Sequence, residues 1–359
     1  MTAAKAKRTA VWALTPNGAR LARTIAGALD GGTLFLSTRI AADDAVAFER
    51  LGDEVDRQFT RFDGHIFVMA TGIVVRTIAG HLVHKTRDPA VVVCDEAGEF
   101  AVSLLSGHVG GANTLARQVA TVTGGRPVIT TATDVNRVPA VDLIAVENGL
   151  AIENPEAIKT VNMALVTGDP IYIHDPYAKV APHLPAAQLR PVEAPVFPDA
   201  QPGLFVDHMR LDLPPHVLVL RPGSLVAGMG CNRGTAMQEM RDLLEETFAT
   251  GNLALASLRA LATVDLKADE AGLVALAESL AVPLTTFSRD RLGSVPHVPS
   301  PSAMVEKHIG VKSVCEAAAL LATHNGRLIV PKRKTANVTL AVAADGYISS
   351  ASAPAARNT

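Results

Sequence analysis

Short apolar runs alternate with amphipathic segments along the first 130 residues, and this alternation leaves few folds open to the chain. Such alternation predicts an α/β layer with a largely parallel sheet. Ligands of such sheets gather at the carboxyl ends of the strands, where the turns 71–72, 106–111 and 131–136 are all expected to lie. A turn at residues 95–98 separates two of the runs and is expected to form a hairpin. The expected strands cover 9–14, 33–36, 65–70, 90–94, 99–104 and 127–130, and the expected helices cover 16–30, 43–51, 73–80 and 112–123.

A second alternation of the same kind begins near residue 217. A final hairpin is expected around Lys332, Arg333 and Lys334. We expect strands at 217–220, 224–227, 262–266, 284–287, 327–330 and 337–342, and helices at 236–249, around 256–261, 270–280 and 315–322.

Proline is concentrated between these two parts, where nine of the 22 prolines fall between Pro182 and Pro222. This density disfavours long helices and predicts an irregular connector with edge strands, after a helix at 155–166 and a strand at 170–174. The expected fold is therefore two α/β units with mainly parallel sheets, joined by a smaller, Pro-rich middle segment. The expected parts are 1–140, 141–222, 223–347 and a disordered tail, 348–359.

Composition narrows the class of protein. A hydrophobic fraction of 48% with 19% charged residues is enough for a large core. The net charge of −2 gives no electrostatic reason to bind nucleic acid or an anionic membrane. The three cysteines are far apart without CxxC spacing, which predicts reduced thiols in a cytoplasmic protein. We find neither a signal peptide nor an apolar stretch of the ~20 residues that a membrane helix needs.

The stretch Ser103–Ala116 carries the clearest signal for a ligand site. Three glycines allow a sharp turn between an expected strand and a helix, which Asn113 and Thr114 are expected to cap. Free N–H groups at such a helix start attract anions. His108 lies within the turn and exchanges a proton near neutral pH. Ser106 does not fit a Gly-x-Ser-x-Gly nucleophile elbow, because residue 104 is leucine.

Other motifs leave alternatives open. The turn 228–235 is neither a dinucleotide fingerprint nor a P-loop, so a carboxylate or polar ligand held by Arg233 is favoured over phosphate, with a purely structural turn as a competitor. His81 and His84 lack the partners of a metal site. The basic run 332–334 is either a solvated loop or a clamp for a polycarboxylate. Ser302 is a candidate helix N-cap.

Taken together, these segments resemble the CbiG family of cobalamin-biosynthesis proteins, the cobalt-precorrin-5A hydrolases. The resemblance extends from about residue 64 to 342, and the segment 142–222 carries little of it. The motifs that carry it are 85–93 (KTRDPAVVV), Asp95, Ser103–Ala116, 228–235, 262–267, 299–302, 314–318 and 331–332.

The resemblance implies an enzyme of the anaerobic route to vitamin B12, a hydrolase acting on a carbon–carbon bond. Its substrate is a cobalt-containing tetrapyrrole with a δ-lactone on ring A. The enzyme opens the lactone with water and releases acetaldehyde to give cobalt-precorrin-5B. No protein-bound metal or cofactor is expected, because the substrate carries the cobalt.

Physical chemistry assigns candidate roles for this reaction. His108 is the expected base, and Asp88 or Asp95 is expected to orient it or act as the acid. Backbone N–H groups of Gly110 and Gly111 are the expected oxyanion donors. Cations and helix starts are expected to hold the anionic arms of the macrocycle. The expected substrate contacts are Thr71, Gly72, Arg76, Ser106, Gly107, Gly110, Gly111, Asn113, Gly230, Arg233, Gly234, Lys267, Ser302, Glu306, Lys332 and Lys334.

Two other functions stay open at this stage. The first is a corrinoid-binding or shuttling protein of the same pathway without catalysis, because the C-terminal part resembles a stand-alone protein of the aerobic route. The second is a phosphate-binding α/β enzyme that uses 228–235. We also expect a homodimer and transient contact with neighbouring pathway enzymes.

Overall fold

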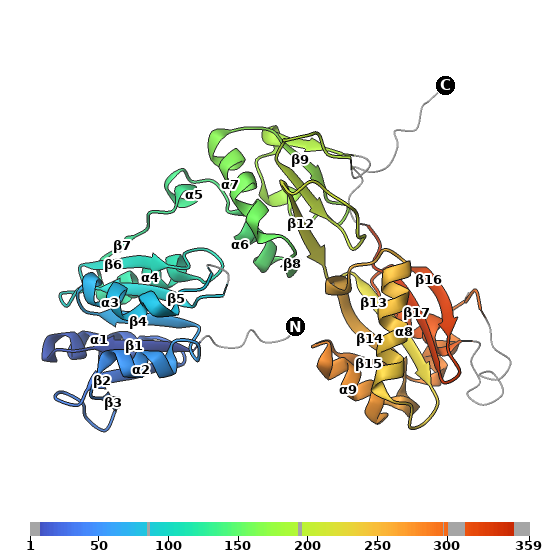
Figure 1. The fold of residues 1–359 in the computed structure, drawn as a ribbon, viewed down its shortest axis with the longest axis horizontal. Coiled ribbons are helices and arrows are strands. Elements are labelled where there is room, and N and C mark those ends of the chain that lie inside the picture. The colour runs from blue at the N-terminus through green and yellow to red at the C-terminus, as the bar shows by residue number, and fades with distance from the viewer. Residues whose placement is uncertain (1–7, 85–86, 193–195, 297, 301–312, 348–359) are drawn as a thin grey trace. The chain divides into compact units, whose positions relative to one another are not determined.

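The computed structural model describes residues 8–84, 87–192, 196–296, 298–300 and 313–347 of the 359-residue chain. Within these residues the chain forms three mixed β-sheets with helices packed on them (Figure 1). It divides into two compact units, Met1–Leu143 with one sheet and Ile144–Thr359 with two. The expected α/β class is confirmed. The four-part division is finer than this one and stays a prediction, and its tail, 348–359, lies outside the described residues.

A seven-stranded sheet forms the first unit, in the order β3-β2-β1-β4-β5-β6-β7. The continuous apolar run of β5, buried along its whole length, is typical of a strand covered on both faces. The strands are β1 (Thr9–Ala13), β2 (Gly32–Ser37), β3 (Val46–Phe48), β4 (Gly64–Val68), β5 (Ala90–Cys94), β6 (Phe100–Leu105) and β7 (Arg126–Val128).

Helices cover both faces of this sheet. On one face, Ile25 of α1 and Leu115 of α4 belong to the same core as Val92 of β5. On the other face, Val55 of α2 and Val74 of α3 belong to a core of aromatic and aliphatic side chains from the strands. The helices of this unit are α1 (Pro16–Ala28), α2 (Leu51–Gln58), α3 (Thr71–Ile78), η1 (Ala79–His81), α4 (Ala112–Thr123) and α5 (Ala132–Val135), and α6 (Val141–Glu147) begins at its end.

Strand direction separates the loops that carry the expected site. β1 to β5 run parallel, but β6 pairs with β5 antiparallel and β7 follows β6. The turns 106–111 and 131–136 therefore lie at one edge of the sheet, and Thr71 and Gly72 lie at the other. The expectation that all three turns share one edge is wrong, because the hairpin at 95–98 reverses the chain.

One expected helix of this unit is wrong. The segment 43–51 contains the edge strand β3, which pairs with β2 through Val46 and Phe35, and the helix α2 begins only at Leu51. The three-residue strand is held by backbone pairing with a distant segment, so its local sequence pattern is a poor guide to it.

The middle of the chain forms a sheet of its own, in the order β10-β9-β11-β12-β8. β10, β9, β11 and β12 are parallel, and β8 is antiparallel to β12. The expected irregular connector with edge strands is wrong, because β11 lies between two neighbours and contains no proline. The elements are β8 (Leu150–Ile152), η2 (Pro155–Ala157), α7 (Ile158–Thr167), β9 (Ile171–His174), η3 (Ala181–His183), η4 (Ala186–Gln188), β10 (Leu189–Pro191), β11 (Gly203–Val206) and β12 (Val217–Pro222).

The third sheet has the order β15-β14-β13-β17-β16. Two strand pairs are parallel and two are antiparallel, so this sheet is evenly mixed and not mainly parallel. The run expected as a helix around 256–261 enters the strand β14. The elements are β13 (Leu225–Cys231), α8 (Met237–Thr250), η5 (Leu255–Ser257), β14 (Leu258–Val264), η6 (Asp265–Lys267), α9 (Ala271–Ser279), β15 (Leu284–Phe287), α10 (Arg289–Gly293), α12 (Val314–Leu321), β16 (Arg327–Lys334) and β17 (Val338–Ala344).

The basic run Lys332-Arg333-Lys334 lies within strand β16, and the chain reverses after it, before β17 begins at Val338. The expected hairpin is present, because β16 and β17 pair antiparallel. Its turn lies after Lys334, however, and the basic run belongs to a strand and is not a solvated loop.

The described part of the chain contains no helix with the length and apolar composition of a membrane span.

Candidate functional site

The glycine-rich turn between β6 and α4 closes on its own backbone. The N–H groups of Gly111, Ala112 and Asn113 donate to carbonyl oxygens of His108, Ser106 and Gly107 at 2.9, 3.1 and 3.0 Å. The Gly111 N–H is therefore already paired and is not available as an oxyanion donor. Gly111, in the left-handed conformation with φ 93°, precedes the helix, so Asn113 lies inside α4 and does not cap it.

Two glycines of this turn are required by packing within the turn. A Cβ on Gly110 would lie 2.3 Å from Cβ of Ser106, and one on Gly107 would lie 2.8 Å from Oδ1 of Asn113. Ser106 itself has φ 58°, and its buried hydroxyl has no partner among the described residues. A non-glycine residue in this conformation stores strain, which often accompanies a functional turn.

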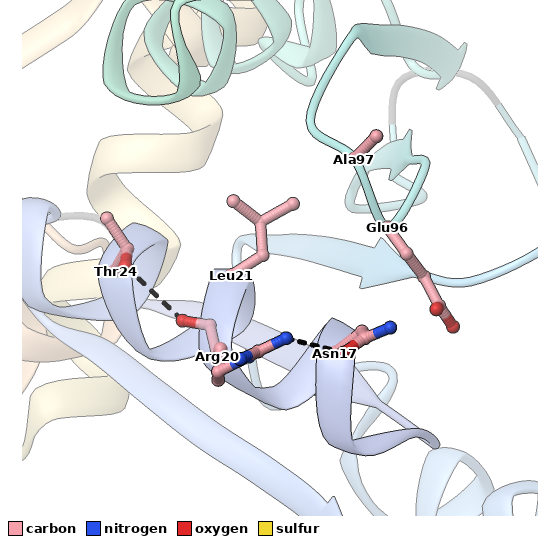
Figure 2. A pocket seen from close by; sticks show the side chains of 6 residues that line it. All are labelled: Asn17, Arg20, Leu21, Thr24, Glu96 and Ala97. Carbon is pink, nitrogen blue, oxygen red and sulfur yellow. Dashed lines mark hydrogen bonds between the residues drawn. The ribbon is translucent and has the colours of Figure 1, made fainter.

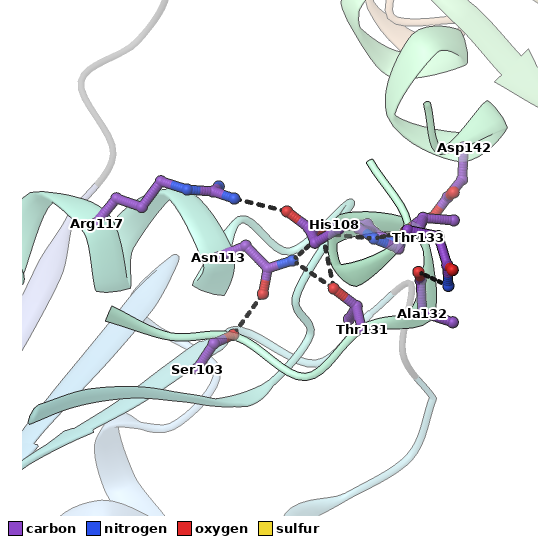
Figure 3. Close-up of polar contacts among 10 residues, drawn as sticks. Ser103, His108, Asn113, Arg117, Thr131, Ala132, Thr133 and Asp142 are labelled. Atoms are coloured by element: carbon purple, nitrogen blue, oxygen red, sulfur yellow. Dashed lines mark hydrogen bonds and ion pairs between the residues drawn. The ribbon is translucent and has the colours of Figure 1, made fainter. Parts of the chain in front are cut away.

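Asn113 connects the turn to the segment that follows β7. Its Oδ1 accepts from the Ser103 hydroxyl at 2.7 Å (Figure 3). Its Nδ2 donates to Oγ1 of Thr131 at 3.1 Å and to Oδ2 of Asp134 at 2.9 Å. Three separate stretches of chain are thereby held together beside His108.

His108 lies between two carboxylates at this edge of the sheet (Figure 3). Its Nε2 is 2.8 Å from Oγ1 of Thr133 and 3.3 Å from Oδ2 of Asp134. Its Nδ1 is 3.6 Å from Oδ2 of Asp142, at the start of α6. The Asp142 side chain is 6% exposed and that of His108 is 19% exposed, so the pair is shielded while the ring stays accessible.

The carboxylates shift the titration of His108. Its contact with Asp142 raises the pKa of His108, burial partly opposes this, and Asp134 raises it further. Burial acts against ionisation of Asp134, but Thr131 and Arg117 hold the pKa of that carboxyl below its usual value. Arg117 donates to it at 2.6 Å. An imidazole held between two carboxylates can both accept and return a proton.

Asp88 and Asp95, the carboxylates expected to assist His108, have other partners. Asp88 accepts from the Val83 N–H at 3.0 and 3.2 Å, at the edge where β6 ends. Asp95 accepts from the N–H groups of Ala97, Glu99 and Phe100 at 2.9, 3.2 and 2.6 Å and so holds the hairpin turn. It lies at the opposite edge from His108, roughly 17 Å away along the strand. The structure therefore does not bring Asp95 and His108 together.

A pocket at that opposite edge holds part of the expected substrate site. Its volume is about 520 Å³, and Thr71 and Asp95 both line it, beside apolar side chains that include Phe100 and Val102. The neighbouring Arg76 donates to the Gly72 carbonyl at 2.9 Å, within the first turns of α3. Thr71, Gly72 and Arg76 thus lie together, apart from His108.

A second depression in the first unit, of about 590 Å³, is formed by α1 and the 95–98 turn (Figure 2). Arg20 donates to Asn17 at 2.5 Å, and Thr24 donates to the Arg20 carbonyl at 3.3 Å. The residues that line it are Asn17, Arg20, Leu21, Thr24, Glu96 and Ala97, and none of the expected site residues is among them.

In the second unit, the expected substrate contacts meet at one edge of the third sheet. The strand registers place Gly230, Arg233 and Lys334 at this edge, and Lys267 follows β14 there. The buried Glu270 connects the turn after β13 to the segment after β14. It accepts from the Gly234 N–H at 2.7 Å and from Lys267 Nζ at 3.2 Å.

Arg233, Lys267 and Lys332 already have protein partners. Arg233 pairs with Asp269 at 2.8 Å. Lys332 donates from Nζ to the Ser300 carbonyl at 2.5 Å and from its backbone N–H to the buried Glu316 at 3.0 Å. The edge is therefore close to neutral around Arg233, and Lys332 supports the fold. Ser302 and Glu306 lie outside the described residues.

Thr133, Asp134 and Asp142, which touch His108, were not among the expected site residues. The turn 131–136 had been expected at a strand end, which was a usable signal for Thr133 and Asp134. Asp142 belongs to a helix that the sequence pattern did not predict. Among the described residues, no cluster of three or more His, Cys, Asp or Glu side chains is placed to hold a metal ion.

Three family models match successive parts of the chain. Residues 53–134 match the family model described as cobalamin synthesis G N-terminal. Residues 139–222 match cobalamin biosynthesis central region, and residues 225–343 match cobalamin synthesis G C-terminus.

Two similar proteins cover nearly the whole chain, and a third covers about one third of it. The cobalt-precorrin-5A hydrolase of Salmonella typhimurium is 36% identical over 95% of this chain and 98% of its own length. That of Priestia megaterium is 32% identical over 94% of this chain and 95% of its own. The protein CobE of a Sinorhizobium species is 35% identical over 33% of this chain and 79% of its own.

Proposed function

The chain belongs to the CbiG family of cobalamin-biosynthesis proteins, and from this premise we propose that it hydrolyses cobalt-precorrin-5A at the His108 site. Two hydrolases of that name match it over nearly their whole lengths. The observation that supports placing the chemistry in the first unit is the half-buried histidine held between Asp134 and Asp142.

The reaction consumes one water for each lactone. The oxygen of water forms a bond to the lactone carbonyl carbon, and the ester C–O bond breaks to leave a carboxylic acid and an alcohol. The alcohol then loses its proton, its C–O bond becomes the carbonyl of acetaldehyde, and the C–C bond to the macrocycle breaks. The electron pair left on the ring carbon takes up a proton. Each stage moves a proton, so a group that titrates near neutral pH can serve all of them.

His108 is proposed to move these protons. In its neutral form the ring accepts the proton of the attacking water, and as imidazolium it returns a proton to the departing oxygen. Asp142 stabilises the imidazolium and orients the ring through Nδ1, as a buried carboxylate does in an acyl-transfer triad. With Asp142 facing Nδ1, Nε2 is the nitrogen that takes up and returns the proton, so the attacking water replaces the Thr133 hydroxyl that contacts Nε2 beside Asp134. Asp88 and Asp95 accept from backbone N–H groups instead, so no part in this transfer is proposed for them.

Substrate binding is proposed to use cations, because the acetate and propionate arms of the macrocycle are anionic. Lys334 and the partly paired Arg233 are the candidates in the second unit, and Arg76 is the candidate in the first.

Cobalt is supplied by the substrate, so no resident cofactor is proposed. The three free cysteines support the cytoplasm as the place of action, and a homodimer remains a proposal.

The test is the release of acetaldehyde from cobalt-precorrin-5A. We expect His108→Ala to lower kcat by about 10²–10⁴-fold, the usual contribution of general acid–base catalysis. His183→Ala, which alters an exposed histidine, is the matched control and is expected to leave kcat unchanged. Retention of kcat within about threefold by His108→Ala would refute the assignment. Binding of the substrate without any release of acetaldehyde by the wild type would favour a corrinoid carrier instead.

A further inference from the structure

The middle sheet carries a buried polar cluster that the proposed reaction does not use. His174 ends β9, and Asp207 and His208 follow β11, at the carboxyl edge of the parallel strands. Oδ2 of Asp207 is 3.0 Å from Nε2 of His174. Ligands of open α/β sheets bind at this edge, so a cluster there is a candidate site.

The ring of His208 is held from one side. Its Nδ1 is 2.7 Å from the Tyr177 hydroxyl, 3.3 Å from the Ser224 hydroxyl and 3.3 Å from Oδ1 of Asp207. Burial lowers the pKa of His208 although Asp207 opposes this, and burial raises the pKa of Tyr177, so the ring is neutral and the phenol keeps its proton near pH 7. The tautomer in which Nδ1 accepts the phenol proton carries the ring proton on Nε2.

A small cavity lies beside this ring. Its volume is about 120 Å³, which is enough for several atoms the size of a water oxygen. His208 lines the cavity, whereas Tyr177, Ser224 and Asp207, which contact Nδ1, do not. The lining residues are His208, Asn325, Arg327, Ala344, Asp345, Gly346 and Tyr347.

The charges around the cavity favour an anion. Arg327 places its guanidinium 5.6 Å from the centre of the Tyr347 ring, where it stays exposed toward solvent. The one carboxylate of the lining, Asp345, is paired with Arg259 at 3.0 Å and accepts from the His324 N–H at 2.8 Å. The charge of Arg327 is therefore the one that a ligand would meet.

We propose that this cavity binds a carboxylate group, with the guanidinium of Arg327 supplying the charge and His208 a hydrogen bond from Nε2. A planar carboxylate matches the two donors of a guanidinium and fits the small volume. The amide of Asn325 offers a further donor at the same wall. The site lies in the second unit and does not depend on the proposed catalysis.

Binding is tested on the full chain with two probes, sodium propionate and a corrinoid with free acetate and propionate arms. Titration is followed by calorimetry and by the NMR signals of the His208 ring. Arg327→Gln is expected to weaken binding by at least about tenfold, the usual effect of losing a charge-assisted hydrogen bond. Arg291→Gln, in which the lost arginine also stacks on a ring, over Phe287 at 5.2 Å, is the matched control and is expected to bind as the wild type does.

The outcomes are separable. Binding of propionate points to a free carboxylic acid as ligand, and binding of the corrinoid alone points to an arm of the macrocycle; both support the site. The proposal is overturned if neither probe moves the His208 signals, or if Arg327→Gln binds as tightly as the wild type. If Arg327→Gln fails to fold, the wild-type titration decides alone. Acetaldehyde release is measured separately, so failure of this site and failure of the proposed activity are distinguishable.

Discussion

Replacing Asp142 by asparagine removes the buried carboxylate closest to Nδ1 of His108 while keeping the shape of the side chain. At 3.6 Å and an effective dielectric constant of 20, the attraction between the two charges is about 5 kcal/mol. Solvent reaches the ring, whose side chain is 19% exposed, so the net effect is smaller. We expect the pKa of His108 to fall by about 1–3 units, the range for one nearby opposite charge, or about 1.4–4 kcal/mol.

This shift has a defined consequence for acetaldehyde release. If neutral His108 accepts the proton of water, kcat/KM rises with pH through the pKa of His108. In Asp142→Asn this rise in kcat/KM moves to lower pH by the same 1–3 units. The kcat/KM reached above the rise falls by at most the ~10²–10⁴-fold that a general base contributes. NMR titration of the His108 ring gives the same pKa without turnover.

The matched control is Asp56→Asn, which breaks another histidine–carboxylate pair of the first unit, with His81 at 2.8 Å. We expect this control to leave both the pH profile of kcat/KM and the NMR titration of His108 unchanged. Two quantities are compared between Asp142→Asn and wild type: the pH midpoint of the rise in kcat/KM and the pKa of His108 from NMR. If both stay within about 0.3 pH units of wild type, this carboxylate does not set the basicity of His108.

Three further predictions follow from named contacts. Asp95→Asn should lower the free energy of unfolding by about 1–3 kcal/mol, because the carboxylate accepts three backbone N–H bonds. The pH profile of acetaldehyde release should stay unchanged, since Asp95 lies at the edge of the sheet opposite His108. A shifted profile would contradict this placement. Gly228→Ala should destabilise by about 1–3 kcal/mol or more in urea unfolding, since its Cβ would lie 1.9 Å from the Cys315 carbonyl oxygen, whereas Gly27→Ala in α1, with open space at its Cβ, should stabilise by up to about 1 kcal/mol. Because folding raises the pKa of His108, its ion pairs should contribute their full stabilisation below its ordinary pKa of 6.5. This contribution should disappear as pH rises through the pKa of the folded state. The difference in unfolding free energy between wild type and His108→Gln should therefore shrink from about pH 6 to about pH 9, and growth of this difference would contradict the prediction.

Local sequence pattern was sufficient for the class of fold and for most of its elements. The strands β5 and β15 and the helix α4 have their predicted bounds, because strand and helix patterns are properties of short segments. The edge strand β3 and the middle sheet were not predicted. Prolines of the middle segment lie in the edge strand β10, at the end of β12 or between strands, where a missing N–H costs little.

The sequence by itself determined that the turn around His108 is a glycine-rich junction of strand and helix with a titratable side chain. Which carboxylates meet that side chain was decided by the tertiary structure. The hairpin at 95–98 was expected from sequence, but its consequence, the reversal of β6, places Asp95 and His108 at opposite edges. α6, which follows the last strand of this sheet, brings Asp142 to Nδ1 instead. Strand direction and helix docking depend on contacts between residues far apart in the chain, so a motif that is read locally identifies the histidine and not its partners.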